Sequence, residues 1–264
     1  MLDVLERKIG VAREVLLGEI KQVHQTHSTV EYAFLIDTLP SLKGQVPRAT
    51  PQKYHAEAIR AYRVARAKSL RLYPGVAETL RKLKAKGCVL IGYTESMESY
   101  SNYRMRNLGL DLLLDYLYAP ADHELPDGFR REGNRKYPFP NHRLRKTKNR
   151  HTPKGETKPN PDLLLAMIDE VGGEKDSTVY IGDSLVKDVG MAQKIGVADV
   201  WAKYGVPQQR EEYELLRRVT HWSDEVVHRE KRASTRAITP NYVLQRSFAE
   251  LWEMFEFAAP RQGE

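Results

Sequence analysis

The sequence predicts an α/β protein in which an open parallel β-sheet is covered by helices on both faces and preceded by a helical segment. Strand-like apolar runs alternate with helix-like stretches from residue 73 to about residue 205, which is typical of parallel sheets covered by helices. Before residue 73, apolar residues recur every three to four positions and no such alternation is present. We therefore expect a helical domain over residues 1–72 and an α/β core over residues 73–264.

The helical domain is expected to contain helices over residues 1–28, with a break near Gly10, and over residues 51–72. Leu2, Leu5 and Ile9 begin the spacing that defines the apolar face of the first helix. The stretch between the two helical regions is less regular and contains prolines and glycine, which favour turns.

The α/β core is expected to begin at Tyr73, where Pro74 and Gly75 follow and the pattern changes. Its predicted helices and strands come in the order helix 76–86, strand 88–94, helix 96–108, strand 115–120, helix 161–173, strand 178–183, helix up to 196 and strand 198–205. The last part of the chain is expected to add a helix at 209–218, a strand at 241–244 and a helix at 247–257.

The composition fits a soluble globular protein, with 41% hydrophobic and 29% charged residues in a chain of 264. No apolar window approaches the roughly 20 residues of a membrane span, and the N-terminus lacks a signal pattern. The single cysteine, Cys88, lies in the apolar run CVLIGY and is expected to be a buried structural thiol. These features predict a cytoplasmic protein without membrane contact.

Two carboxylates mark the turn after the predicted strand 178–183. Asp183 follows the strand directly in the sequence GDS, and Asp188 lies about one turn into the helix that comes next. Ligands bind at this edge of open parallel sheets, and paired carboxylates suit Mg²⁺, which leaves coordination sites for phosphate oxygens and water. The alternative is a surface turn whose aspartate only caps the helix.

Two further polar positions fall at the same predicted sheet edge. Thr94 ends the strand 88–94 and is followed by Glu95 and Ser96, so that a hydroxyl and backbone N–H groups could cradle a phosphate. Lys158 precedes a helix in KPNPDLL, where prolines keep the segment extended. Alone, such a threonine can be a helix cap and such a lysine a solvated side chain, so the prediction depends on their occurring together.

These motifs resemble those of the haloacid-dehalogenase-like (HAD) hydrolases. The resemblance covers about residues 73–120 and 155–205 and rests on LYPGVAETLRKLKAKG, LGLDLLLDYLYAP, KPNPDLL and IGDSLVKDV. It implies a Rossmann-like parallel sheet with an N-terminal helical cap, and a Mg²⁺-dependent phosphatase that acts on small phosphomonoesters. The acidic GDS turn favours the phosphatase branch over the dehalogenase branch, which uses no metal.

The resemblance also implies roles for individual residues. Thr94, Glu95 and Lys158 would bind the substrate, with Lys158 neutralising the phosphoryl group. Asp183 and Asp188 would be the metal residues, with Asp188 also supporting the lysine. Thr94, Lys158 and Asp188 are the predicted catalytic residues, and a small phosphorylated metabolite is the predicted partner.

The family's nucleophile motif, DxDx(T/V), is missing from the sequence. Asp37 in YAFLIDTLP is the only candidate, and because Leu35 and Leu39 flank it at a distance of two, no Asp-x-Asp pair exists. The resemblance places the motif at the end of a first core strand between the strands that carry Thr94 and Asp183. We therefore expect that strand to be absent and this chain to be inactive or incomplete.

Three explanations for the missing strand remain open. The first is a chain that begins late, so that Met1 is an internal methionine of a longer protein. The second is a degenerate homologue with a non-catalytic binding or regulatory role. Alternatively, YAFLID or a strand from a partner fills the position, since unpaired strand edges are costly.

The net charge of +7 comes from one segment, a basic insertion over residues 121–157. Ten Lys and Arg and one acid lie between Arg130 and Lys154, so this stretch carries +9 and the remainder −2. Its aromatic and histidine residues Tyr137, Phe139, His142 and His151 would suit anionic substrates or RNA. A solvated surface loop is the alternative, and the acidic balance elsewhere argues against nucleic acid. The sequence leaves the oligomeric state open.

Overall fold

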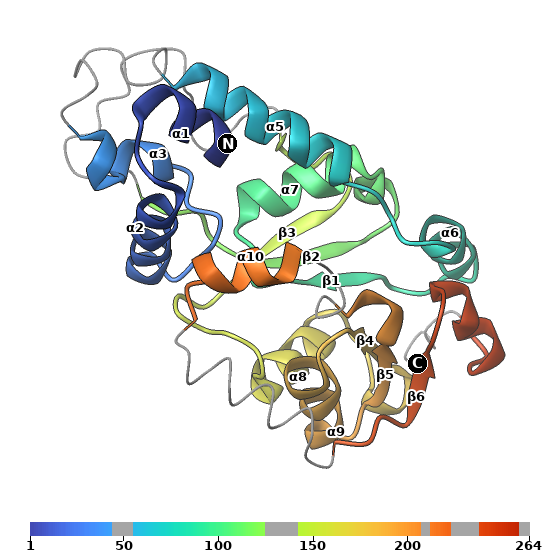
Figure 1. Ribbon diagram of the computed structural model, residues 1–264. Helices are drawn as coiled ribbons and strands as arrows, with labels where there is room; N and C mark the ends of the chain where they lie inside the picture. The colour runs from blue at the N-terminus through green and yellow to red at the C-terminus, as the bar shows by residue number, and fades with distance from the viewer. Residues whose placement is uncertain (44–54, 125–141, 207–211, 223–237, 259–264) are drawn as a thin grey trace. The chain divides into compact units, whose positions relative to one another are not determined.

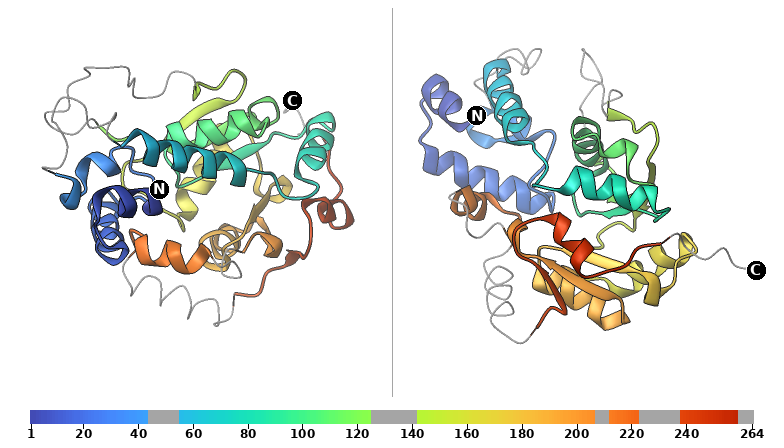
Figure 2. Two further views of the ribbon diagram at one scale, coloured as in Figure 1. Left: turned by 45° about the horizontal axis from the view of Figure 1, so that its top comes forward. Right: turned by 90° about the vertical axis from the view of Figure 1, so that its right-hand side faces the viewer.

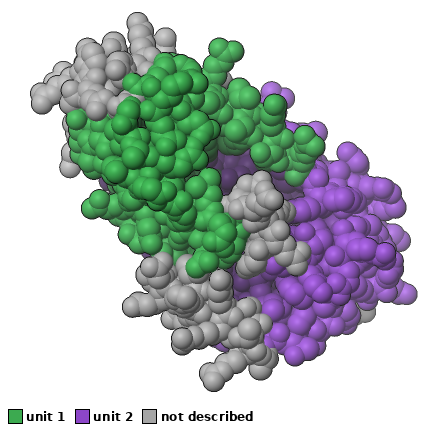
Figure 3. Space-filling view, in the orientation of Figure 1, with its two compact units in different colours: residues 1–71, 207–227 green, residues 72–206, 228–264 purple. Residues whose placement is uncertain are grey.

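A computed structural model describes residues 1–43, 55–124, 142–206, 212–222 and 238–258 (Figure 1). The chain divides into two compact units, coloured separately in Figure 3. Unit 1 comprises residues 1–71 and 207–227, and unit 2 comprises residues 72–206 and 228–264. Unit 1 thus includes a segment, 207–227, that the sequence analysis placed in the α/β core.

Unit 1 is helical throughout its described part. Its elements are α1 (Leu2–Ile9), α2 (Arg13–Thr26), α3 (Leu35–Thr38), the 3-10 turn η1 (Pro40–Leu42), α5 (Ala56–Ser69) and α10 (Glu212–Val219). Most of its buried apolar side chains come from α1, α2 and the chain around α3, among them Leu5, Leu16, Leu17, Ile20, Phe34, Leu39 and Leu42, and α5 adds Ala58. The helices predicted over 1–28 and 51–72 are confirmed, except that residues 51–54 lie outside the described part.

Helix α10 is held against α2 by polar contacts as well as by packing. The Arg218 guanidinium pairs with the Glu14 carboxylate. His24 Nδ1 lies 2.6 Å from the carbonyl oxygen of Val219, at the end of α10. A segment more than 180 residues from α2 in the sequence therefore completes the helical unit.

The described residues of unit 2 form two three-stranded sheets in which all neighbouring strands are parallel. The first has the order β1 (Ile91–Tyr93), β2 (Tyr116–Pro120), β3 (Lys148–Thr152), and the second the order β4 (Val179–Gly182), β5 (Ala198–Ala202), β6 (Tyr242–Leu244). Ile91 is in register with Tyr116, and Val179 with Ala198. The parallel α/β class predicted from the sequence is confirmed.

Helices and short helical turns precede, connect and follow these strands (Figure 2). They are α6 (Val76–Ala85), α7 (Glu98–Asn107), η2 (Leu110–Leu112), α8 (Pro161–Glu170), η4 (Lys175–Ser177), the π-helical turn η5 (Leu185–Val189), α9 (Gly190–Ile195), η6 (Lys203–Gly205) and η8 (Phe248–Glu253). The predicted helix at 247–257 is a 3-10 helix instead. Ser247 caps it, with its side chain accepting the N–H of Ala249 at 3.0 Å.

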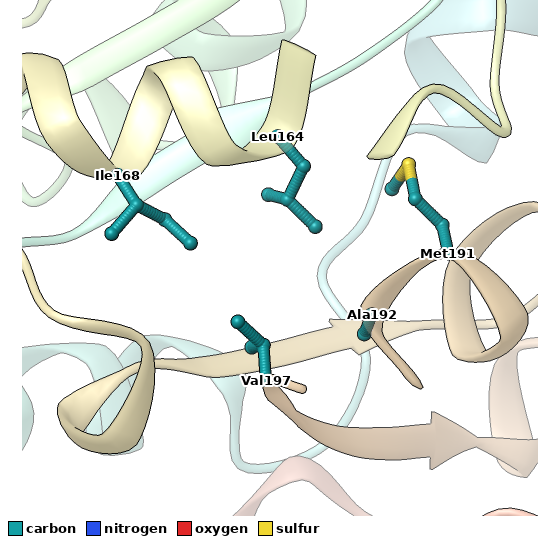
Figure 4. Packing of buried hydrophobic residues seen from close by; sticks show 5 residues of the cluster. All are labelled: Leu164, Ile168, Met191, Ala192 and Val197. Atoms are coloured by element: carbon teal, nitrogen blue, oxygen red, sulfur yellow. The ribbon is translucent and has the colours of Figure 1, made fainter. Parts of the chain in front are cut away.

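The side chains of β4 alternate between two apolar clusters, as expected for a strand covered on both faces. Tyr180 packs with a cluster from α8, α9 and the start of β5 (Figure 4), made of Leu164, Ile168, Met191, Ala192 and Val197. Val179 and Ile181 pack with the opposite cluster, made of Val200, Leu244 and Leu251. This burial fixes which way each β4 side chain faces.

The strand that the family resemblance places between β1 and β4 is not supplied by the described part of the chain, as expected from the missing motif. There, β1 pairs with β2 alone and β4 with β5 alone. The segment YAFLID does not fill the position, because Leu35–Thr38 forms α3 in unit 1. Within the described ranges, no helix is long and apolar enough to cross a lipid bilayer.

Candidate functional site

Asp188 is the most buried carboxylate among the predicted site residues, and its position depends on Gly182. A Cβ atom on Gly182 would lie 2.2 Å from Asp188 Cγ, so only glycine leaves room for the carboxylate. Asp188 Oδ1 accepts the Lys158 ammonium at 3.0 Å and the Tyr180 hydroxyl at 3.1 Å. Its Oδ2 accepts the backbone N–H of Ser184 at 3.0 Å. Three donors therefore hold a carboxylate that is 4% exposed.

The Lys158 ammonium lies among aromatic rings as well as beside Asp188. Its Nζ is 4.6 Å from the ring centroid of Tyr93 and 5.6 Å from that of Tyr180. The lysine side chain is 13% exposed. Ring faces and one carboxylate thus stabilise a cation that has lost most of its water.

Both tyrosines keep their protons at neutral pH. Burial, followed by the nearby carboxylates of Glu95 and Asp188, raises the pKa of Tyr93 to about 12. Burial and the Asp188 carboxylate also raise the pKa of Tyr180. The Tyr180 hydroxyl can therefore act as the donor to Asp188.

Glu95 is engaged by protein donors. Its Oε1 accepts the backbone N–H of Lys158 at 2.7 Å, and its Oε2 accepts the Lys187 ammonium at 2.9 Å. The sequence analysis assigned Glu95 to substrate binding, whereas here its carboxylate links the chain after β1 to Lys158 and to η5. A carboxylate repels a phosphate, so substrate binding alone does not account for a glutamate at this position. The contacts of Glu95 with Lys158 and Lys187 do account for it.

Thr94 forms hydrogen bonds with backbone groups close to it. Its hydroxyl oxygen accepts the N–H of Ser96 at 3.0 Å, and its own N–H donates to the carbonyl oxygen of Tyr118 at 3.0 Å. The first contact closes the turn that leads from β1 to α7. The hydroxyl keeps its proton for one further hydrogen bond, since it acts as an acceptor in this contact.

Asp183 is exposed at the carboxyl end of β4. Its backbone carbonyl oxygen accepts the indole N–H of Trp201 at 3.0 Å. No group of three or more His, Cys, Asp or Glu side chains in the described ranges is arranged to hold a metal ion. The two carboxylates predicted to bind Mg²⁺ thus differ in environment, because Asp188 is buried and accepts three hydrogen bonds whereas Asp183 is exposed. One carboxylate fits this ion when phosphate oxygens and water complete its coordination.

The structure thus joins Glu95, Lys158 and Asp188 in one set of contacts at the carboxyl edges of β1 and β4. Thr94 directly precedes Glu95, and Asp183 directly follows Gly182, which contacts Asp188. Asp37, the weak nucleophile candidate, lies in α3 of unit 1.

Sequence analysis did not identify Tyr93, Tyr180, Gly182 or Lys187 as parts of this arrangement. The available signals were the polar-tipped tyrosines within apolar strands and the lysine directly before Asp188. None of these signals reveals which groups meet, because the contacts join segments up to 92 residues apart.

The described part of the basic insertion, residues 121–124 and 142–157, contains the edge strand β3. Lys148 and Arg150 lie over the ring of Tyr116, at 5.3 and 5.5 Å from its centroid. Arg150 pairs with Glu170, and His151 Nε2 lies 2.8 Å from Glu98 Oε2. His142 stacks edge-on against Tyr103, while Tyr137 and Phe139 lie outside the described residues. Lys148 and Arg150 of the insertion are therefore engaged within unit 2.

Comparisons with known proteins show the family of the chain and its fold. The sequence model of the haloacid dehalogenase-like hydrolases matches residues 3–196, whereas no curated protein matches the chain. A HAD phosphatase from Thermococcus onnurineus is similar in structure, with 18% identity, 98% of this chain and 87% of that chain covered, and a TM-score of 0.53. A predicted phosphoglycolate phosphatase from Haemophilus somnus 129pt has 17% identity, coverage of 96% and 88%, and a TM-score of 0.46. A 2-haloacid dehalogenase from Pseudomonas syringae has 14% identity, coverage of 96% and 86%, and a TM-score of 0.44.

Proposed function

Because the chain belongs to the haloacid dehalogenase-like hydrolases, we propose that unit 2 carries a phosphatase-type site for the phosphoryl group of small phosphorylated metabolites. The observation that carries the proposal is the Lys158 ammonium, held by Asp188 and two tyrosine rings at a sheet edge. A largely desolvated cation of fixed position attracts an anion more strongly than a solvated surface lysine does. An ammonium has three N–H donors, so Lys158 can bind a phosphate oxygen while it remains bonded to Asp188.

The other residues assist this binding in distinct ways. The Thr94 hydroxyl donates to a second phosphate oxygen, and Asp188 holds the Lys158 ammonium in place. Mg²⁺, when bound, would neutralise phosphate oxygens beside Asp183, and it is the cofactor that we propose. These residues together screen the charge of a phosphate dianion.

The described residues favour binding without turnover. Covalent phosphoryl transfer needs a carboxylate oxygen that can approach the phosphorus. In the described part of unit 2, the carboxylate bonded to the Lys158 ammonium is that of Asp188, which is buried and fixed by three donors. This engagement supports a second candidate function, a non-catalytic binding protein on the same fold.

Isothermal titration with inorganic phosphate in the presence of Mg²⁺ tests the binding step. We expect the 264-residue chain to bind and Lys158→Met to bind about 10- to 100-fold more weakly, because a charge-assisted hydrogen bond worth about 1.5–3 kcal/mol is lost. Lys82→Met is the matched control, since Lys82 lies on α6 in an exposed pair with Glu78. Equal phosphate affinity in the wild type and Lys158→Met would contradict the proposed site.

Hydrolysis of p-nitrophenyl phosphate, measured with and without Mg²⁺, tests the catalytic step separately. We expect no hydrolysis by this chain above the buffer control. Turnover that disappears in Asp37→Asn would instead identify Asp37 as the nucleophile and overturn our interpretation of the missing motif.

A further inference from the structure

We infer that Glu95 is a positioning residue that fixes the Lys158 segment and ties the two sheets of unit 2 together through Lys187. Its two carboxylate oxygens contact different segments: Oε1 accepts the Lys158 N–H at 2.7 Å, and Oε2 accepts the Lys187 ammonium at 2.9 Å. Glu95 itself follows β1, whereas Lys187 belongs to η5 after β4. One side chain therefore joins three segments at the edge of the sheets. This inference concerns the lysine on which the proposed function rests.

The connection matters because no backbone ladder joins the two sheets in the described part of the chain. At their carboxyl edges, β1 and β4 are connected by side chains instead. These connections are the Glu95–Lys187 pair, the Lys158–Asp188 pair and the contacts of Lys158 with Tyr93 and Tyr180. Glu95 belongs to the first connection and anchors the segment that makes the other two.

The environment of the Glu95–Lys187 pair separates it from ordinary surface pairs. The side chains of Glu95 and Lys187 are 30% and 15% exposed, compared with 70% and 58% for Glu78 and Lys82 on α6. Solvent screens an exposed pair, so its removal changes little. Removing the Glu95 carboxylate takes a counter-charge from a largely buried ammonium, which is more disruptive.

Hydrogen exchange at the Lys158 amide provides a direct test that does not require activity. In Glu95→Ala the Lys158 N–H loses its acceptor, and we expect it to exchange about tenfold faster than in the wild type. Glu95→Gln keeps an oxygen for this N–H, so the exchange rate should return close to that of the wild type. Glu78→Ala is the matched control and should leave the rate unchanged.

Phosphate affinity provides the second measurement. Glu95→Ala should weaken the binding of inorganic phosphate because Lys158 is no longer held in place, and Glu95→Gln should restore most of it. Glu95→Asp, which is one methylene too short to reach both donors, replaces the alanine variant if that variant does not fold.

The outcomes separate this inference from the proposed function. Unchanged exchange at Lys158 in Glu95→Ala would overturn the positioning role, and tighter phosphate binding in that variant would show that Glu95 competes with the anion instead. Faster exchange in a protein whose wild type binds no phosphate would support the positioning role while refuting the proposed phosphate site.

Discussion

Gly182 determines where the Asp188 carboxylate can lie. Asp188 is close to Gly182 in the sequence, but its side chain folds back over the end of β4 to reach Lys158 and Tyr180. Any Cβ atom at position 182 would occupy the space of that carboxylate. Glycine is required here by close approach, since its backbone does not adopt the left-handed conformation.

Gly182→Ala is predicted to destabilise the protein by about 1–3 kcal/mol, the usual cost of forcing extra volume into a packed region. The reason is the 2.2 Å separation between the added Cβ and Asp188 Cγ. Urea unfolding of the variant measures the change. Gly18→Ala is the control: nothing lies within 4 Å of a Cβ at this helical position, so a gain of about 0.5–1 kcal/mol is expected. Equal stability of Gly182→Ala and the wild type would contradict the packing argument.

At the level of secondary structure, apolar patterning predicted the buried strands but did not predict the edge strand β3. β4 and β5 were predictable because Val179, Ile181 and Val200 belong to apolar runs that pack on a cluster. β3 has the sequence KNRHT, which contains no aliphatic side chain. Its strand conformation comes from pairing with β2, and charged residues are common on edge strands because they oppose further pairing. A sequence pattern based on burial could not find it.

The contact of α2 with α10 is predicted to weaken in acid because of His24. Burial, the largest effect, and the nearby His27 lower the pKa of His24 in spite of its hydrogen bond to the Val219 carbonyl group. As the pH falls below about 6.5, the ordinary histidine value, the unfolded chain takes up a proton that folded His24 resists. The unfolded state then binds more protons, so the free energy of unfolding decreases with falling pH.

Urea unfolding between pH 7.5 and pH 5 checks this prediction. His24→Asn is the matched variant, because its side-chain amide can donate to the same carbonyl group but does not titrate. As the pH falls, the free energy of unfolding of the wild type should decrease more than that of this variant. A difference that stays constant across the range would show that His24 does not contribute to the acid sensitivity.

For the molecule as a whole, the order of motifs predicted which segments meet, but not every residue that takes part in the contacts. Parallel strands end at a common edge, so Glu95, Lys158 and Asp188 could be expected to meet from the sequence alone. The partners that complete the site, Tyr180 and Lys187, depend on how α8 and η5 pack. Such tertiary contacts have no signal in a single sequence.

The division of the chain into units was less predictable than the site. The change at Tyr73 from helical periodicity to alternating helices and strands predicts a helical domain over residues 1–72. Nothing in the helix at 212–219 indicates that its partner is α2 near the N-terminus. In the sequence, the second segment of unit 1, residues 207–227, therefore follows most of the residues of unit 2.

A fragment of residues 1–72 is consequently predicted to be incompletely folded until a peptide of residues 207–227 is added. Without α10, α2 lacks the Arg218–Glu14 pair and the acceptor for His24, and a chain of this length has little core to spare. Circular dichroism should show an increase in helicity beyond the sum of the two components, and a higher melting temperature for the mixture. A scrambled peptide of the same composition should have neither effect. A fragment that melts cooperatively at the same temperature with and without the peptide would show instead that residues 1–72 form a self-sufficient domain.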